Sequence, residues 1–249
     1  MRLPFPSFIV ALLGAATIAA VPAAAFAAGG RITGSGVTKT DTRAVGGFHA
    51  VALAVQGKLE LRQDGTEGLS ITGDDNIVPL VETVVEDATL KIRWKKGTES
   101  TSYRDLSLVV HAKDVDGLAI AGSGQIDAKT LNSRTLRVSL AGSGRMAIEA
   151  LKADALRASI DGSGELTVAG RVESLDVSAA GSGRLSAGKL ESRTATVTLA
   201  GSGMATIAAS ETLTATVEGS GAIRYYGSPR VTSTVAGSGT VRREGDRSA

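Results

Sequence analysis

The sequence of 249 residues contains no cysteine. Disulfide bonds, thiolate catalysis and cysteine-ligated metal sites are therefore excluded, and so is a lipid anchor on an acylated cysteine. His49 and His111 are the two histidines, and two imidazoles are too few for a metal site without strong carboxylate help. We expect no cofactor, and we expect packing alone to stabilise the fold.

Aromatic side chains and proline are also scarce. Phe, Trp and Tyr together make up 3% of the residues, and there are 5 prolines. Since 43% of the residues are hydrophobic, a sizeable core is possible, but Val, Leu, Ile and Ala must build it. Little proline beside 31 glycines and many β-branched residues is typical of tightly turned β-structure rather than of disorder.

Neither sign of charge is in large excess. The 27 basic and 25 acidic residues leave a formal net charge of +2. A nucleic-acid-binding protein needs a basic patch that neutralises phosphates, and a nearly balanced charge does not favour one. We therefore expect no nucleic-acid partner.

The first 27 residues are typical of an export signal. Arg2 supplies a positive charge, an apolar run follows over residues 8–20, and Ala25-Phe26-Ala27 has the small-x-small pattern of a cleavage site. A membrane anchor is the alternative, but it needs about 20 apolar residues and this run is shorter. We predict cleavage between Ala27 and Ala28, no membrane span afterwards, and an exported protein that is periplasmic, cell-surface or secreted.

A tripeptide, Gly-Ser-Gly, recurs through the second half of the chain. Its copies follow one another at steps of 20, 20, 19, 20, 18 and 18 residues, and an additional copy, Gly34-Ser35-Gly36, lies just after the signal. Self-similarity at a fixed period is the signature of a solenoid. The seven regular copies are Gly122-Ser123-Gly124, Gly142-Ser143-Gly144, Gly162-Ser163-Gly164, Gly181-Ser182-Gly183, Gly201-Ser202-Gly203, Gly219-Ser220-Gly221 and Gly237-Ser238-Gly239.

Each copy lies between two alternating segments. Apolar and polar residues alternate strictly before the tripeptide, as over residues 136–140, and again more briefly after it, as over residues 146–148. A period of two predicts strands with one buried face. One repeat is therefore expected to contain two strands joined at a Gly-Ser-Gly corner and closed by a polar return such as residues 191–194.

The glycines and the spacing together favour a coil. Stacked corners leave no room for a Cβ atom, which explains the glycines. Each coil must also return to the same angular position, so we expect the small differences in repeat length to fall in the polar return segment. The corners fall at about twice the 8–12-residue spacing of turns in antiparallel sandwiches. We predict an all-β fold, a single-stranded right-handed parallel β-helix with 18–20-residue coils, with an antiparallel meander or sandwich as the alternative.

The chain is predicted to have five segments. Residues 43–120 are less regular, and we expect longer-looped coils that cap the N-terminal end of the repeat, with a separate small β domain as the alternative. The charged residues Arg242-Arg243-Glu244 are expected to protect the last strand edge. The segments are a signal peptide at 1–27, a linker at 28–42, irregular β-helix coils or cap at 43–120, the regular repeat at 121–241 and a charged tail at 242–249.

Several short motifs, in a fixed order, resemble a known family. The motifs are Gly47-Phe48-His49-Ala50-Val51, Leu59-Glu60-Leu61, Ile71-Thr72-Gly73-Asp74-Asp75-Asn76, Leu90-Lys91-Ile92 and the chain of Gly-Ser-Gly corners. Over about residues 43–240 the sequence is similar to the bacterial head GIN domain, also called the putative auto-transporter adhesin domain. The resemblance implies a right-handed β-helix and an exported location, and it implies little about activity.

The sequence offers few candidates for chemistry. The corner serines could display hydroxyls to a glycan, but we expect them to hydrogen-bond neighbouring corners and satisfy backbone groups. Asp74 and Asp75, with Glu82, Glu86 and Asp87 nearby, could bind a cation or act on a glycan, although a solvated turn is the simpler interpretation. We predict neither catalytic nor metal-binding residues.

One surface pattern predicts a binding face. In the last coils the outward positions of the alternating strand are all threonine, and stacking in register would make a flat Thr-x-Thr array. Such arrays resemble the surface of β-solenoid ice-binding proteins, although threonine also simply suits exposed strands. The possible binding surface is Thr196, Thr198, Thr214, Thr216, Thr232 and Thr234.

These features favour a non-enzymatic exported β-solenoid that acts as an adhesin-like interaction module at the cell surface or in the periplasm. Its expected partner is a polymer or a protein of the envelope or the extracellular space. A carbohydrate-active enzyme on a β-helix scaffold is the alternative by fold analogy alone, and an envelope scaffold protein without a ligand is a third hypothesis. Three or more carboxylates converging with a basic residue in the largest groove would favour the enzyme. A bare Ser, Thr and Ala surface would favour the interaction module.

Overall fold

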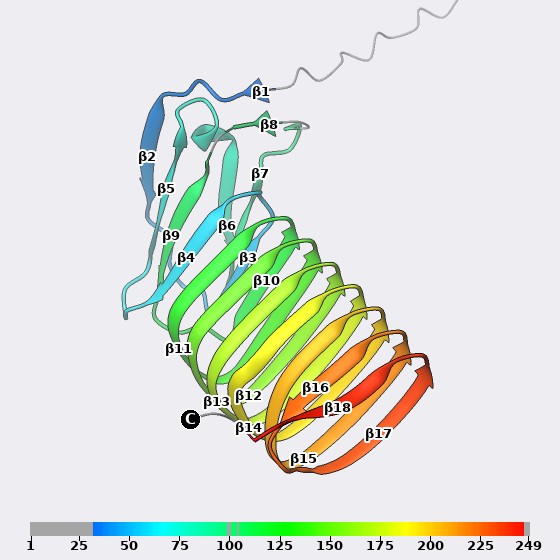
Figure 1. The fold of residues 1–249 in the computed structure, drawn as a ribbon. Coiled ribbons are helices and arrows are strands. Elements are labelled where there is room, and N and C mark those ends of the chain that lie inside the picture. The colour runs from blue at the N-terminus through cyan, green and yellow to red at the C-terminus, as the bar shows by residue number, and fades with distance from the viewer. Residues whose placement is uncertain (1–31, 99–100, 104, 247–249) are drawn as a thin grey trace, which may run out of the picture. The chain divides into compact units, whose positions relative to one another are not determined.

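The computed structural model describes residues 32–98, 101–103 and 105–246, and almost all of this part of the chain is β-structure (Figure 1). The predicted export signal at 1–27 and its cleavage site between Ala27 and Ala28 lie outside the described residues. Among the described residues, no helix is long and apolar enough to cross a membrane.

The second half of the chain is a parallel β-solenoid of about six turns. Five long strands each cover one whole turn, and each pairs in parallel with the next along the chain (Figure 1). The predicted parallel β-helix is thereby confirmed, whereas its right-handed sense stays a prediction of the crossover rule. The strands are β11 (Gln125–Gly142), β12 (Arg145–Gly162), β13 (Glu165–Gly181), β14 (Arg184–Gly201) and β15 (Met204–Gly219).

The predicted division of each repeat into two strands and a loop is wrong. The chain bends in the middle of each long strand, but the pairing continues through the bend, as between Asn132 and Lys152 and between Ser133 and Ala153. The predicted polar return at 191–194 accordingly lies inside β14. Identical bends stacked on one another keep their backbone groups in register, so no loop is needed to reverse the chain. We call these stacked mid-strand bends the return bends.

The Gly-Ser-Gly corners are as tight as their glycines predict. At Gly142 the backbone has φ +113°, and a Cβ atom there would lie 2.7 Å from the carbonyl oxygen of Gly122. A Cβ on Gly144 would lie 2.9 Å from the oxygen of Gly124. Between them, the backbone N–H of Ser143 donates to the carbonyl of Gly122 at 2.9 Å. Glycine therefore lets successive corners approach closely enough to hydrogen-bond.

Changes in coil length fall near the return bends, as predicted. Strand β13 is one residue shorter than β12. The register between the two strands shifts between Ile148 and Leu151 of β12. Gly170 of β13, which pairs with Leu151, has φ +126°. Strand β15 is shorter again, and its shifts flank Glu191 and Ser192 of β14. The corners and the strands that lead into them keep their register, so the core columns stay aligned.

The core is a set of aliphatic columns inside the coil. Alternate side chains of every turn point inward and stack on residues of the same kind in the next turn, and nearly all of them are buried. Burying a leucine or valine side chain stabilises the fold by about 1.5–3 kcal/mol, which offsets the lack of aromatic residues. One such column is Leu136, Leu156, Leu175, Ala195 and Leu213.

The parallel ladder continues from the regular turns into the N-terminal part. On one side β10 (Gly117–Gly122) pairs with β3 (Ala50–Leu53), which pairs with β7 (Thr89–Trp94). On the other side β11 pairs with β4 (Lys58–Gln63), which pairs with β9 (Ser107–Ala112). These four N-terminal strands supply the coils that precede the regular repeat.

Antiparallel strands cover the N-terminal edge of this ladder. Strand β5 (Gly68–Asp74) pairs with β9 and with β2 (Thr38–Arg43), and β6 (Val81–Glu86) pairs with β7. An antiparallel partner ends a parallel stack because the chain can no longer coil in the same direction. The remaining short elements here are the 3₁₀ helix η1 (Val78–Leu80) and the pair β1 (Ile32–Thr33) and β8 (Thr101–Ser102).

Strand β2 and the additional tripeptide differ from expectation. The segment predicted as a linker, 28–42, contains β1 and most of β2, whose polar sequence has no apolar alternation to reveal a strand. Gly34-Ser35-Gly36 forms no corner of the coil: the side chain of Asp74 accepts from the N–H of Gly36 at 3.0 Å, and that of Asn76 accepts from the N–H of Ser35 at 3.0 Å. The acidic cluster therefore holds an N-terminal turn.

The last coil is formed by three shorter strands. Strand β16 (Ala222–Tyr226) pairs with β15 and with β18 (Thr240–Gly245), and β17 (Arg230–Gly237) pairs with β15. The segment predicted as a charged tail, 242–249, thus begins inside a strand, because the charged side chains of β18 conceal its alternation. β17 and β18 form the C-terminal end of the solenoid (Figure 1).

The corner geometry predicts a large difference between neighbouring substitutions. Gly201 has φ +119°, and a Cβ there would lie 2.5 Å from the oxygen of Gly181. Gly201→Ala should lower the free energy of unfolding by about 2–4 kcal/mol through backbone strain and overpacking. Ser202→Ala, at an exposed side chain in the same corner, should change it by less than about 0.5 kcal/mol. Urea unfolding measures both, and equal effects would contradict the corner model.

Candidate functional site

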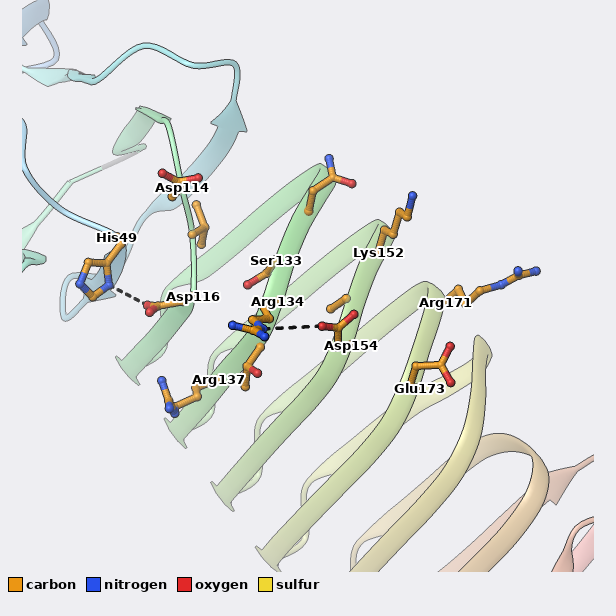
Figure 2. Close-up of a pocket in the computed structure, with 14 residues that line it drawn as sticks. His49, Asp114, Asp116, Ser133, Arg134, Arg137, Lys152, Asp154, Arg171 and Glu173 are labelled. Atoms are coloured by element: carbon orange, nitrogen blue, oxygen red, sulfur yellow. Dashed lines mark hydrogen bonds and ion pairs between the residues drawn. The ribbon is translucent and has the colours of Figure 1, made fainter.

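An open groove runs along the return bends of the solenoid. An open cavity of about 890 Å³ spans the bends from Asp114 to Glu173 (Figure 2). A second cavity of about 520 Å³ continues it to Tyr226, and the two share Arg171 and Glu173. Together the cavities follow one side of the solenoid over successive turns, and we call this surface the bend groove.

Small residues form the floor of the bend groove. They occupy the same position of successive bends and pair with one another in register. Longer side chains on either side stand above them, so the shallow depression continues from coil to coil. The floor residues are Ser133, Ala153, Val172, Ser192 and Ala209.

Polar and charged residues form the two rims. Each rim is again a column: the first lies immediately before the floor residue and the second immediately after it, except that Glu211 lies two residues after Ala209. The first rim is Asn132, Lys152, Arg171 and Glu191, and the second is Arg134, Asp154, Glu173, Arg193 and Glu211.

Ion pairs between successive coils link the rim residues. Arg171 contacts Glu191 at 2.6 Å, and Arg193 contacts Glu211 at 2.6 Å, a hydrogen bond that raises the pKa of the Arg193 guanidinium. Because these side chains are exposed, water and salt screen the pairs and they contribute little to stability. Together the two rims carry charges of both signs rather than a field of one sign.

The N-terminal half of the bend groove combines these pairs with two unpaired cations. Arg134 lies 4.0 Å from Asp154, and the Nδ1 atom of His49 lies 2.8 Å from Asp116 at the end of the groove (Figure 2). Of the described residues, none places a carboxylate within ion-pair distance of Arg137 or Lys152. These two side chains are therefore available to a ligand without loss of an existing ion pair.

The carboxylates of the groove do not form a catalytic pair. Asp114, Asp116, Asp154 and Glu173 line the larger cavity together with four basic residues, so the surface is not a bare Ser, Thr and Ala one. Figure 2 shows Asp114 and Asp116 on the segment before β10 and the other two carboxylates on the next long strands, spread apart rather than converging. The side chains of Asp154 and Glu173 are 74% and 64% exposed, whereas a glycosidase acid needs a desolvated carboxyl whose pKa is raised.

The corner serines act through their backbone rather than their side chains. In five successive corners the serine N–H donates to a glycine carbonyl of the preceding coil. The predicted side-chain hydrogen bonds between corners are not found in the described part of the chain, because the serine side chains are exposed to solvent. The five serines are Ser143, Ser163, Ser182, Ser202 and Ser220.

The threonine array is present in the register that the sequence predicts. Thr196 pairs with Thr214 and Thr214 with Thr232, while Thr198, Thr216 and Thr234 form a parallel column. All six side chains are exposed or partly exposed. The array lies on the strand segments that lead into the corners, and its six residues do not line the bend groove.

The histidines and remaining acidic residues serve local contacts. His49 lies just before β3, and His111 lies in β9 with its Nδ1 atom 2.5 Å from Asp64. Thr66 and His111 hydrogen-bond to the Asp64 carboxylate and lower its pKa to about 2. Within the described ranges, no group of three or more His, Asp or Glu side chains could hold a metal ion.

Sequence reasoning did not identify the bend groove. Its residues fall in the polar returns, where no residue type repeats from coil to coil as glycine and serine do at the corners. A charged residue recurs at positions 134, 154, 173, 193 and 211, and this recurrence could have indicated the groove. It becomes visible only when the coils are aligned by their corners.

The fold and the groove together define a parallel β-solenoid with an open polar surface that extends over several turns. The family model for "Putative auto-transporter adhesin, head GIN domain" matches residues 47–229. The chain belongs to this family, as the sequence motifs indicated. A search of curated proteins finds no match.

Solved structures share the fold. A putative adhesin from Bacteroides fragilis is 26% identical, with a TM-score of 0.81, over 85% of this chain and 99% of that chain. A putative lipid binding protein from Parabacteroides distasonis is 26% identical, with a TM-score of 0.74, over 86% and 99%. A putative adhesin from Parabacteroides merdae, 24% identical with a TM-score of 0.68 over 86% and 98%, shows the fold alone.

The floor of the bend groove predicts one stability effect. Ser192 is 4% exposed, and its hydroxyl donates to the carbonyl of Ala208 at 2.5 Å, beside the register shifts between β14 and β15. Ser192→Ala should lower the free energy of unfolding by about 1 kcal/mol, because this side-chain bond supports the bend where the ladder is interrupted. Ser178→Ala, on an exposed strand position, is the matched control and should have no measurable effect in urea unfolding.

Proposed function

We propose that the protein is an exported, non-enzymatic interaction module that binds an extended polar polymer of the cell envelope or extracellular space along the bend groove. The single observation that carries this proposal is the continuity of the groove over successive turns. A surface that repeats with the coil offers many weak contacts to a ligand that also repeats, and their number compensates for the weakness of each. Membership of a family named for adhesins supports the same interpretation.

The charges of the groove favour one kind of polymer. Four basic and four acidic side chains line the larger cavity, so a polyanion or a polycation would meet repulsion as often as attraction. A neutral glycan carries hydroxyl groups that donate to carboxylates and accept from Arg and Lys, and it suits rims that carry charges of both signs. We therefore favour a neutral glycan of the envelope or matrix over an acidic polymer or a nucleic acid.

The other candidate ligand classes fit the groove less well. A lipid-binding role, the one named for the structure from Parabacteroides distasonis, would need an apolar cavity that encloses acyl chains, and the bend groove is open and charged. A carbohydrate-active enzyme would need two convergent carboxylates in different environments, which the exposed Asp154 and Glu173 do not supply.

A second candidate function comes from the threonine array. Its six residues lie in two straight columns in register. Neighbouring threonines are separated by the inter-strand spacing of a sheet along each column, and by two residues of extended strand between the columns. A flat, regular hydroxyl surface of this kind can order water. Ice binding is therefore a separate hypothesis that uses different residues and has its own test.

Binding to envelope glycans tests the groove. The exported protein should bind an immobilised neutral glycan, and the double variant Arg137→Ala/Lys152→Ala should weaken binding at least about tenfold, because it removes the two cations without carboxylate partners. Arg157→Ala is the matched control, since Arg157 is exposed in the next coil, in register with Arg137, but lies outside the groove.

Three outcomes would contradict the proposal. They are equal loss of binding in Arg157→Ala, binding to anionic lipid vesicles but to no glycan, and release of reducing ends from the glycan by the parent protein. The last outcome would instead support the enzyme alternative, and Asp154→Asn and Glu173→Gln would then show which carboxylate is needed.

Thermal hysteresis tests the threonine array. If the array binds ice, the parent protein should lower the freezing point below the melting point of ice, and Thr214→Lys should remove this gap by placing a charged chain at the centre of the columns. Lys152→Ala, outside the array, should leave the gap unchanged. A parent protein without measurable hysteresis ends the ice-binding hypothesis.

A further inference from the structure

The C-terminal end of the solenoid has one protected arm and one open arm. On the β18 arm, Arg243 lies in register with Tyr225, two residues beyond the pair of Val241 and buried Ile223. Its guanidinium donates to the carbonyl of Gly227 at 2.7 Å and to the hydroxyl of Ser228 at 3.0 Å. A charged residue placed in this way protects a strand edge against pairing with another chain, as the sequence predicts for this segment.

The β17 arm has no such protection. Every residue of β17 is exposed, and within the described part of the chain β17 pairs with β15 on one side only. Val231 and Val235 are 36% and 42% exposed, although they lie in register with the buried core residues Leu213 and Val217. They are core positions of a coil that lacks a following coil to cover them.

The exposed edge is self-complementary. Residues 231–235 read Val-Thr-Ser-Thr-Val, the same in both directions. In an antiparallel pair of two copies centred on Ser233, each Val231 faces a Val235 and each Thr232 faces a Thr234. Facing β-branched residues and facing threonines are favourable cross-strand pairs, and the four valines would be buried on the inner face.

We propose that β17 is a dimer interface, in which two copies of this chain pair their β17 strands antiparallel about a two-fold axis at Ser233. The two β17 arms then join edge to edge, their four valines share one inner face, and the threonine columns continue on the outer face, while the two β18 arms, each one strand beyond β16, diverge from one another. An isologous contact of this kind closes with two copies and leaves no free β17 edge.

The other end of the solenoid does not offer an equivalent partner. There the antiparallel strands β2, β5 and β6 cover the parallel ladder, and Arg43 donates to the carbonyls of Val78 and Val81. Head-to-tail stacking would therefore bring β17 against antiparallel strands, which do not continue the parallel coil. The β17 strand of a second copy is the edge whose sequence matches.

Because the chain contains no cysteine, disulfide cross-linking tests the pairing directly. In Ser233→Cys the new thiols of two copies face each other at about 5 Å between Cβ atoms, and mild oxidation should give a covalent dimer. In Val231→Cys the thiols lie about 14 Å apart along the strands, so this variant should remain monomeric on denaturing gels. Mixing Val231→Cys with Val235→Cys should restore the cross-link.

Solution mass provides the second test. The parent protein should show a concentration-dependent mass that rises to twice that of the monomer in sedimentation equilibrium. Ser233→Arg places two like charges face to face at the axis and should give a folded monomer, whereas Ser178→Arg should dimerise like the parent. A parent that stays monomeric at all concentrations, or a Ser233→Cys variant that cross-links no better than Ser178→Cys, would overturn the proposal.

Discussion

The structure depends on one backbone hydrogen bond that repeats along the solenoid, the bond from the corner serine N–H to the first glycine carbonyl of the preceding coil. The bond requires corners to stack without Cβ atoms between them, which is why glycine occupies both sides of the serine. Once the corners are stacked, every other position of the coil is placed above its counterpart. The aliphatic columns, the threonine columns and the bend groove are consequences of that register.

The bend groove shows how a regular stack can carry a variable surface. The strand segments that lead into the corners must keep alternating, because their inner residues form the core. The return bends are less constrained, and they accommodate both the changes in coil length and the most varied side chains. Arg134, Asp154 and Glu173 can therefore differ in charge from coil to coil while the floor between the rims stays small.

The two ends of the solenoid differ in how their unpaired strand edges are covered. A parallel stack leaves an unpaired edge at each end, and an exposed edge invites association with other chains. At the N-terminal end antiparallel strands cover it. At the C-terminal end Arg243 protects one arm, and the β17 arm stays open with two valines exposed, which is the condition for a specific contact between two copies.

The sequence by itself determined the coil: the recurring tripeptide and the alternation before it specify a β-solenoid, because each is a local signal that repeats. The absence of cysteine and the scarcity of aromatic residues required its core to be aliphatic and held by packing. It also placed Thr196, Thr214 and Thr232 in one column. Only the tertiary structure decided that each turn is a single bent strand, that Asp74 and Asn76 hold the first Gly-Ser-Gly copy, and that the bends align into a groove. Those features depend on contacts between residues far apart in the chain, and neither a period nor a composition records which distant residues meet.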